Sequence, residues 1–179
     1  MKTALIVIDV QRALCEGEHE VFDAAGVIER INAVSGKARQ ADVPVVLVQH
    51  ESAGPLMARG SHGWQLAHGL HTEPTDVLVE KTTPDSFHRT QLEACLRERG
   101  VTQLVVCGMQ SDFCVDTTTR RALALGFPVV LVADAHSTLD NAQLSAAQII
   151  AHHNLTLSSI GSFGPVVTLA AASDVRFEA

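Results

Sequence analysis

Short apolar runs rich in β-branched residues alternate along the chain with patterns typical of amphipathic helices. The first run covers residues 4–10, and a helical pattern follows over residues 21–41. An apolar run without polar alternation is typical of a parallel strand that is covered on both faces, because neither face meets water. This feature favours folds in which helices flank a parallel sheet on both sides.

The same alternation continues to the end of the chain. Strand-like runs cover residues 44–49, 76–80, 103–108, 128–134 and, at the end, 166–170. Helical patterns cover residues 89–99, 114–125 and 143–153, and a long loop covers residues 51–74. Gly100 and Gly126 follow the first two of these helices, where glycine adopts the left-handed conformation that ends a helix. We therefore expect a three-layer, Rossmann-like open sheet of the α/β class, mostly parallel, with about six strands and helices on both faces.

Size and composition restrict the classes of function. The chain has 179 residues, which favours a single domain over residues 1–179, and a net charge of −7. No basic cluster is present to neutralise phosphates, so nucleic acid is not an expected partner. No apolar stretch reaches the roughly 18 residues of a membrane helix, and the four cysteines show no disulfide spacing. We expect a cytoplasmic protein that binds a small molecule and no membrane.

Reactive side chains stand where several predicted strands end, which is the edge at which ligands bind in such sheets. Asp9 ends the first strand, Lys81 ends the third, and Cys114 lies where the loop after the fourth strand becomes a helix. A charged group at the end of an apolar strand is costly unless it is paired. Two interpretations follow: Asp9 and Lys81 form an ion pair that caps the sheet, or together with Cys114 they supply a nucleophile and its proton relay.

Cys114 is the strongest candidate for a nucleophile. Ser111 or Asp112 is expected to cap the following helix, which would place the thiol in the first helical turn. The positive end of the helix dipole and the nearby Lys81 would then favour the thiolate. The alternative is that Cys114 is a small apolar side chain of the core.

Three stretches resemble the isochorismatase-like cysteine hydrolases, a family that includes nicotinamidases and N-carbamoylsarcosine amidohydrolase. They are ALIVIDVQ, VEKTTPDSF and LVVCGMQSDFCVDTTTRRALALGFPVVLVADA, and the resemblance covers nearly the whole chain. It implies that Asp9 is the general base, that Lys81 orients it and stabilises the charges, and that Cys114 attacks the substrate carbonyl. It also implies a cis peptide bond between Met109 and Gln110, and an oxyanion hole formed by the backbone N–H groups of Gln110 and Cys114.

The function implied by the resemblance is a cysteine-dependent hydrolase that cleaves the carbon–nitrogen bond of a small amide through a thioester intermediate, without a cofactor. One alternative is a vinyl ether hydrolase of the isochorismatase type, in which Asp9 supplies acid catalysis and the cysteine is dispensable. Another is a non-catalytic binding module on the same sheet, although no phosphate-binding glycine motif follows any strand. Members of the family commonly form dimers or larger assemblies, so a homodimer or higher homo-oligomer is expected. The sequence does not identify the substrate.

Five further residues are candidates for the substrate pocket. Gln11 and His50 lie at the ends of the first and second strands, and the apolar lining is expected from Trp64, Phe87 and Phe113. The alternatives are a surface amide for Gln11, a solvated loop histidine for His50 and a loop anchor for Trp64.

A metal site is not expected. Nicotinamidases hold a metal on an Asp-x-His motif after the second strand and on a further histidine, whereas this chain has VQHES at residues 48–52. His50 and His62 would be two neutral ligands without a third, which is a weak basis for a zinc site.

Overall fold

In a computed structural model of the chain, which describes residues 1–177, a six-stranded sheet forms the centre. The strands are β1 (Thr3–Ile8), β2 (Val45–His50), β3 (Val77–Lys81), β4 (Gln103–Met109), β5 (Val129–Ser137) and β6 (Val167–Ala170). They lie in the order β3-β2-β1-β4-β5-β6, and every pairing between neighbours is parallel. The prediction of an open, mostly parallel α/β sheet is confirmed.

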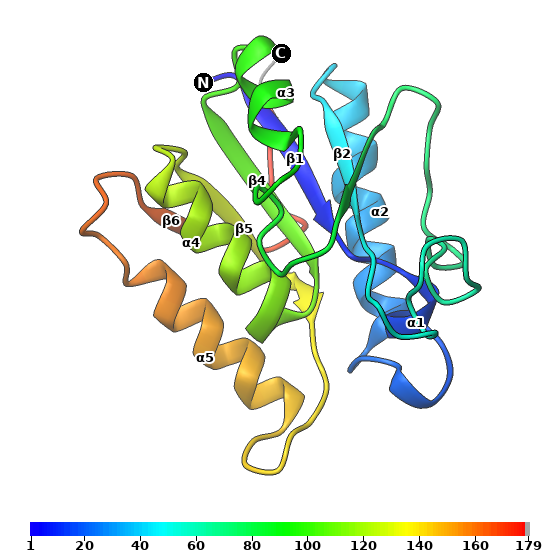
Figure 1. Cartoon of the computed structure of the whole chain (residues 1–179). Helices are drawn as coiled ribbons and strands as arrows, with labels where there is room; N and C mark the ends of the chain where they lie inside the picture. The colour runs from blue at the N-terminus through cyan, green and yellow to red at the C-terminus, as the bar shows by residue number, and fades with distance from the viewer. Residues whose placement is uncertain (178–179) are drawn as a thin grey trace.

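Helices cover both faces of this sheet (Figure 1). The helix α2 (Ala24–Gln40) packs on one face, and α3 (Leu92–Glu98), α4 (Asp116–Ala124) and α5 (Ala146–Ser158) pack on the other. The short helix α1 (Arg12–Cys15) and the 3-10 turn η1 (Gly17–His19) follow β1 and were not predicted. Within residues 1–177 the structure has no helix that combines the length and the apolar character needed to cross a membrane.

The apolar runs of the sequence fill two separate cores. Leu5 and Val7 of β1 join the core beneath α2, whereas Ile6 and Ile8 join the core on the opposite face. Successive side chains of a strand point to opposite faces, so a strand buried on both faces needs an apolar residue at every position. This is the physical reason why no polar alternation appears in these runs.

The strand β5 is longer than the apolar run that predicted it. It continues past residue 134 to Ser137, and after a register shift His136 pairs with Gly108 and Ser137 pairs with Met109. The side chains of His136 and Ser137 are buried, at 2% and 0% exposure. The predicted strand ends too early because His136 and Ser137 are polar, and their hydrogen-bond partners lie far away in the chain.

The predicted helix over residues 114–125 begins differently from expectation. A π-helical turn, η2 (Ser111–Val115), comes first and leads directly into α4. Cys114 therefore lies in the π-helical turn and not in the first turn of an α-helix. Neither Ser111 nor Asp112 caps the helix, since no side-chain cap bond forms at either helix start. The hydroxyl of Ser111 contacts His136 instead, and the carboxylate of Asp112 accepts from Thr138.

Gly108 allows β4 to approach β1 closely at the end that carries the candidate site. Its φ is +117°, and a Cβ atom at this position would lie 2.1 Å from the backbone oxygen of Ile8. Gly126, which ends α4, also has a positive φ of +90°, but a Cβ atom there would meet no atom within 4 Å. Comparing an alanine substitution at each glycine therefore separates two contributions to the loss of stability, that of the backbone conformation and that of the close approach.

We predict that Gly108→Ala lowers the free energy of unfolding by about 3 kcal/mol, because the strained conformation and the clash with Ile8 add together. The matched control Gly126→Ala carries only the conformational cost, about 1 kcal/mol. Urea denaturation of both variants measures the difference. Equal losses would show that the approach of β4 to β1 is not a constraint.

Candidate active site

Asp9 and Lys81 form an ion pair inside the protein. Asp9 directly follows β1 in a left-handed conformation, with φ of 50°, and its backbone N–H donates to Val48 O at 2.9 Å. Lys81 is the last residue of β3, and its Nζ lies 2.7 Å from Asp9 Oδ2. The lysine and aspartate side chains are 0% and 1% exposed. The predicted convergence of these two strand ends is thus present in the structure.

The ammonium group of Lys81 also contacts His50 and Cys114. Its Nζ lies 3.1 Å from His50 Nδ1 and 3.2 Å from Cys114 Sγ. With Asp9, these make three acceptors for the three protons of the ammonium, which has no lone pair to accept with. His50 Nδ1 must therefore be unprotonated. The contact between Lys81 and His50 was not predicted, although the two residues are direct partners in the β2–β3 ladder.

Burial controls the protonation of these groups. It raises the pKa of the Cys114 thiol to about 12, and the charge of Asp9 acts in the same direction while Lys81 opposes it. Burial also raises the pKa of Asp9 above 3.8, against the charge of Lys81. The pKa of His50 is lowered by burial and by Lys81. The expectation that Lys81 favours the thiolate is not met, because the loss of hydration on burial outweighs the effect of its charge.

The donor atoms of Asp9, His50 and Cys114 lie within 4.8 Å of one another, a spacing compatible with a metal ion. The ammonium of Lys81 donates to one atom of each, so a cation already occupies the centre of this group. His62, the other histidine considered for a metal, is exposed and contacts the Arg12 guanidinium at 3.2 Å. The geometry therefore supports a lysine-centred site in place of a metal centre.

Gln110, one of the two predicted backbone donors, lies between β4 and η2. The peptide bond between Met109 and Gln110 is cis, the isomer that the resemblance implies. The carbonyl of Gln110 accepts from the N–H groups of Phe113 and Val115 at 3.2 and 3.1 Å. Across the part of the chain that the structure describes, the N–H of Gln110 itself has no acceptor. It is free to bind another group.

Two of the predicted pocket residues, Gln11 and Phe87, are buried and contact other parts of the protein. Gln11 is fully buried, and its amide bonds the backbone of His50 in both directions and also donates to Trp64 O at 2.6 Å. It braces the backbone and has no free group for a substrate. Phe87 is 7% exposed and belongs to the core, where its ring stacks on Phe127 at 6.3 Å. Cys114 packs against the same core, so a pocket role for Phe87 stays a prediction.

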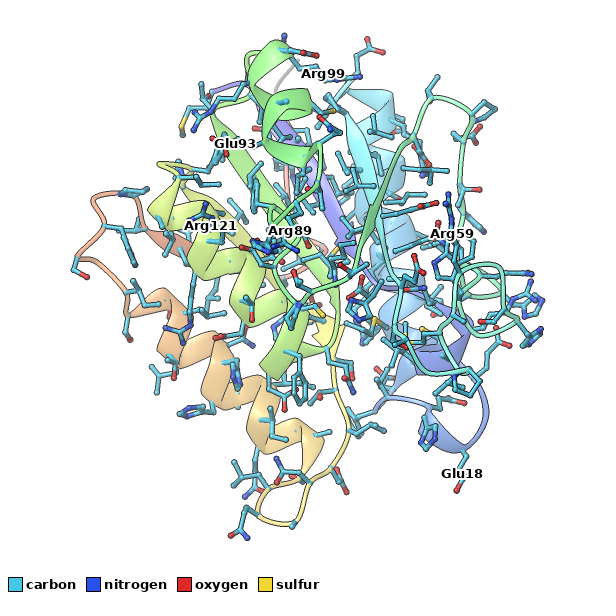
Figure 2. The ribbon with its side chains drawn as sticks, viewed as in Figure 1. Glu18, Arg59, Arg89, Glu93, Arg99 and Arg121 are labelled. Atoms are coloured by element: carbon cyan, nitrogen blue, oxygen red, sulfur yellow. The ribbon has the colours of Figure 1, made fainter. Side chains whose placement is uncertain are left out.

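Phe113 and Trp64 lie in more open positions. Phe113 precedes Cys114 and is 53% exposed. Trp64 is half-buried in the long loop between β2 and β3, and no acceptor for its buried indole N–H occurs among residues 1–177. The same loop is tied to β3 by Arg59, labelled in Figure 2, which donates to Glu80 Oε1 at 2.8 Å. A pocket role for these two aromatic residues stays a prediction.

Comparison with known proteins gives consistent matches. Residues 3–169 match the family model described as the isochorismatase domain. A streptothricin hydrolase of Streptomyces noursei is 43% identical, over 76% of this chain and 50% of its own length. A ureidoacrylate amidohydrolase of Methylobacterium radiotolerans is 31% identical, over 74% of this chain and 66% of its own length. A crystal structure of an isochorismatase family protein superposes with a TM-score of 0.86 and 36% identity, covering 95% of this chain and 98% of that chain.

The sheet, the buried Asp–Lys pair and the adjoining thiol place the chain in the class of α/β proteins with a buried polar cluster at the carboxyl edge of the sheet. The family match covers most of the chain, and the chain therefore belongs to the isochorismatase family of hydrolases. This confirms the resemblance noted from the sequence. The chain spans about half the length of the streptothricin hydrolase that it matches. Relatives named as amidohydrolases agree with the expectation of an enzyme that acts on carbon–nitrogen bonds.

The buried ion pair leads to a stability prediction. Lys81→Met leaves the Asp9 carboxylate buried without its counter-ion, which we expect to cost about 3–5 kcal/mol of unfolding free energy at neutral pH. The folded-state pKa of Asp9 then rises further above the unfolded value. The penalty exists only where Asp9 is ionised in the unfolded chain, so it shrinks as the pH falls toward 3.8.

Chemical denaturation of wild type and variants at pH 7 and pH 5 measures this loss. The double variant Asp9→Asn with Lys81→Met removes both charges and should recover part of the stability of Lys81→Met. If the double variant is no more stable than Lys81→Met, the uncompensated carboxylate is not the cause of the loss.

Proposed function

We propose that the protein hydrolyses the carbon–nitrogen bond of a small amide or ureido compound through a thioester on Cys114. The observation that carries this proposal is the single ammonium of Lys81 that donates to both Asp9 and Cys114, at 2.7 and 3.2 Å. This arrangement holds a base beside a thiol and places a fixed positive charge next to both. Relatives named streptothricin hydrolase and ureidoacrylate amidohydrolase support the choice of an amide substrate.

The first step transfers the thiol proton of Cys114 to Asp9. Asp9 Oδ2 accepts from Lys81, whereas Oδ1 is buried and has no hydrogen-bond partner among the described residues. Burial raises the pKa of Asp9, and the neighbouring thiol of Cys114 opposes this rise only in part. Oδ1 is the oxygen left to take the proton. Sulfur then forms a bond to the substrate carbonyl carbon, and the carbonyl π electrons move to oxygen.

The tetrahedral oxyanion is held by backbone donors, the free N–H of Gln110 and the N–H of Cys114. When it collapses, the carbon–nitrogen bond breaks, and the leaving nitrogen takes the proton from Asp9. A thioester on Cys114 remains. Asp9 then removes a proton from water, the hydroxyl adds to the thioester carbon, and the carbon–sulfur bond breaks. The thiol regains its proton, and the net products are an acid and an amine, or ammonia for a primary amide.

The raised pKa values suit this sequence of steps. With its pKa near 12, Cys114 is a thiol at rest and does not react with adventitious electrophiles as a free thiolate would. Asp9, whose pKa is raised by burial, is a stronger base than a solvated aspartate. The proton therefore moves only when a carbonyl is in position to receive the sulfur electrons.

We predict that Cys114→Ala and Cys114→Ser each lower turnover by at least about 10³-fold, because alanine has no nucleophile and serine is far less acidic than the thiol. Ammonia release is measured with a panel of ureido compounds and small amides that includes ureidoacrylate, and streptothricin hydrolysis is followed by mass spectrometry. Cys95→Ser on α3 is the matched control and should keep wild-type turnover. Full amide turnover in Cys114→Ala would contradict the thioester on Cys114.

The pH profile tests the assignment of the base. Protonated Asp9 cannot accept the thiol proton, so kcat/KM should fall as the pH is lowered, with an apparent pKa above 3.8 because burial raises the pKa of this group. His50 also titrates in the acid range, below 6.5. His50→Asn keeps an acceptor for Lys81 but cannot titrate, so the acid limb should persist in this variant. Loss of the limb in His50→Asn would assign it to the imidazole.

A further inference from the structure

A second buried polar network lies beside the candidate site and takes no part in the steps above. Ser111 Oγ is 2.7 Å from His136 Nδ1, and His136 Nε2 is 2.9 Å from Asn154 Oδ1. Asn154 Nδ2 donates to the backbone oxygen of Ala133 at 3.0 Å. The network joins η2, β5 and α5, and Ser111 and His136 are 0% and 2% exposed.

The directions of these hydrogen bonds follow from the chemistry of the groups. Because the amide nitrogen of Asn154 donates to Ala133 O, its oxygen faces His136 and can only accept. His136 must therefore carry its proton on Nε2, which leaves Nδ1 as an acceptor. The hydroxyl of Ser111 then donates to Nδ1. Burial and the neighbouring His153 lower the pKa of His136, in agreement with a neutral ring.

The order serine, histidine, asparagine is similar to a hydrolase triad, but this network is not a second nucleophilic site. Ser111 is completely buried, so no substrate can reach its oxygen. Asn154 is uncharged and would not stabilise an imidazolium as an aspartate does. The network must act through the backbone to which it is attached.

That backbone carries the proposed oxyanion donor. Ser111 directly follows Gln110, whose N–H belongs to the cis peptide bond and has no acceptor in the described chain. Ser111 is also the first residue of η2, the turn that holds Cys114. On the other side, His136 is fixed by its pairing with Gly108 in the β4–β5 ladder. A hydrogen bond from Ser111 to His136 therefore links a rigid strand to the residue beside the donor.

We infer that Ser111, His136 and Asn154 are positioning residues that hold the Gln110 N–H and the Cys114 turn in the geometry required for the oxyanion. This inference rests on the proposed function. We call this network the relay. With a neutral His136, the hydroxyl of Ser111 donates to Nδ1. A charged His136 would reverse that bond, because Nδ1 would become a donor as well. An asparagine at position 154 preserves the neutral state, whereas an aspartate would favour the charged one.

Ser111→Ala tests the positioning role. An oxyanion donor acts mainly in the transition state, so we expect kcat to fall about 10–100-fold while KM changes less than about 3-fold. Ser137→Ala is the matched control, since Ser137 is equally buried beside Met109 but donates to Phe22 O outside the relay. It should lose stability without the loss of kcat. Wild-type kcat in Ser111→Ala would overturn the inference.

Asn154→Asp tests the relay through its charge. The carboxylate should raise the pKa of His136, whose other charged neighbours are His153 and Asp134. Below this pKa the bond to Ser111 reverses, so kcat should gain a new acid limb between about pH 5 and 8. The limb should vanish when Ser111→Ala is added. A limb that persists without the hydroxyl would show that it does not act through Ser111.

Imidazole ¹⁵N NMR separates this inference from the proposed function. His136 should carry its proton on Nε2 and be neutral at pH 7, because burial lowers its pKa below 6.5. Ser111→Ala should shift the Gln110 amide resonance, while Ser137→Ala leaves it in place. If the wild type hydrolyses no compound of the panel, the proposed function fails, and these resonances still decide whether the relay holds the turn. A proton on Nδ1, or an unmoved Gln110 resonance in Ser111→Ala, contradicts the relay.

Discussion

The geometry of the candidate site depends on one buried ion pair, between Lys81 at the end of β3 and Asp9 after β1. Either charge alone at this depth would be unfavourable by several kcal/mol, so each requires the other. The two remaining protons of the ammonium bind His50 and Cys114. One group therefore contacts a carboxylate, an imidazole and a thiol that come from separate segments. The sheet order β3-β2-β1-β4 brings those segments to one edge.

The last residues of β4 are constrained from both neighbouring strands. On the β1 side, the absence of a side chain at Gly108 permits contact with the backbone of Ile8. On the β5 side, His136 extends the sheet beyond the apolar run and bonds Ser111. The cis peptide bond and the π-helical turn follow directly, so the backbone that presents Cys114 is held between two rigid strands. A turn held in this way can keep backbone donors oriented without help from solvent.

Much of this arrangement was readable from the sequence, because carboxyl ends of parallel strands share one edge. That rule alone brings Asp9, Lys81 and Cys114 together. It does not determine which way a loop turns, and it did not indicate that Phe87 is buried in the core. Nor does it reveal burial, which depends on the whole tertiary structure and reverses the expected effect on the pKa of the thiol. The role of His136 was hidden because its partners lie in other elements.

Burial favours the neutral form of Cys114, Asp9, His50 and the neighbouring His136. The pKa values of Cys114 and Asp9 rise, and those of His50 and His136 fall. A dry interior resists the creation of charge but not its relocation. In the proposed reaction the negative charge leaves Asp9 as it accepts the thiol proton and appears on the substrate oxygen, while Lys81 stays positive. The number of charges is the same before and after the attack, so the burial that keeps the thiol protonated at rest adds little to the barrier once a carbonyl is bound.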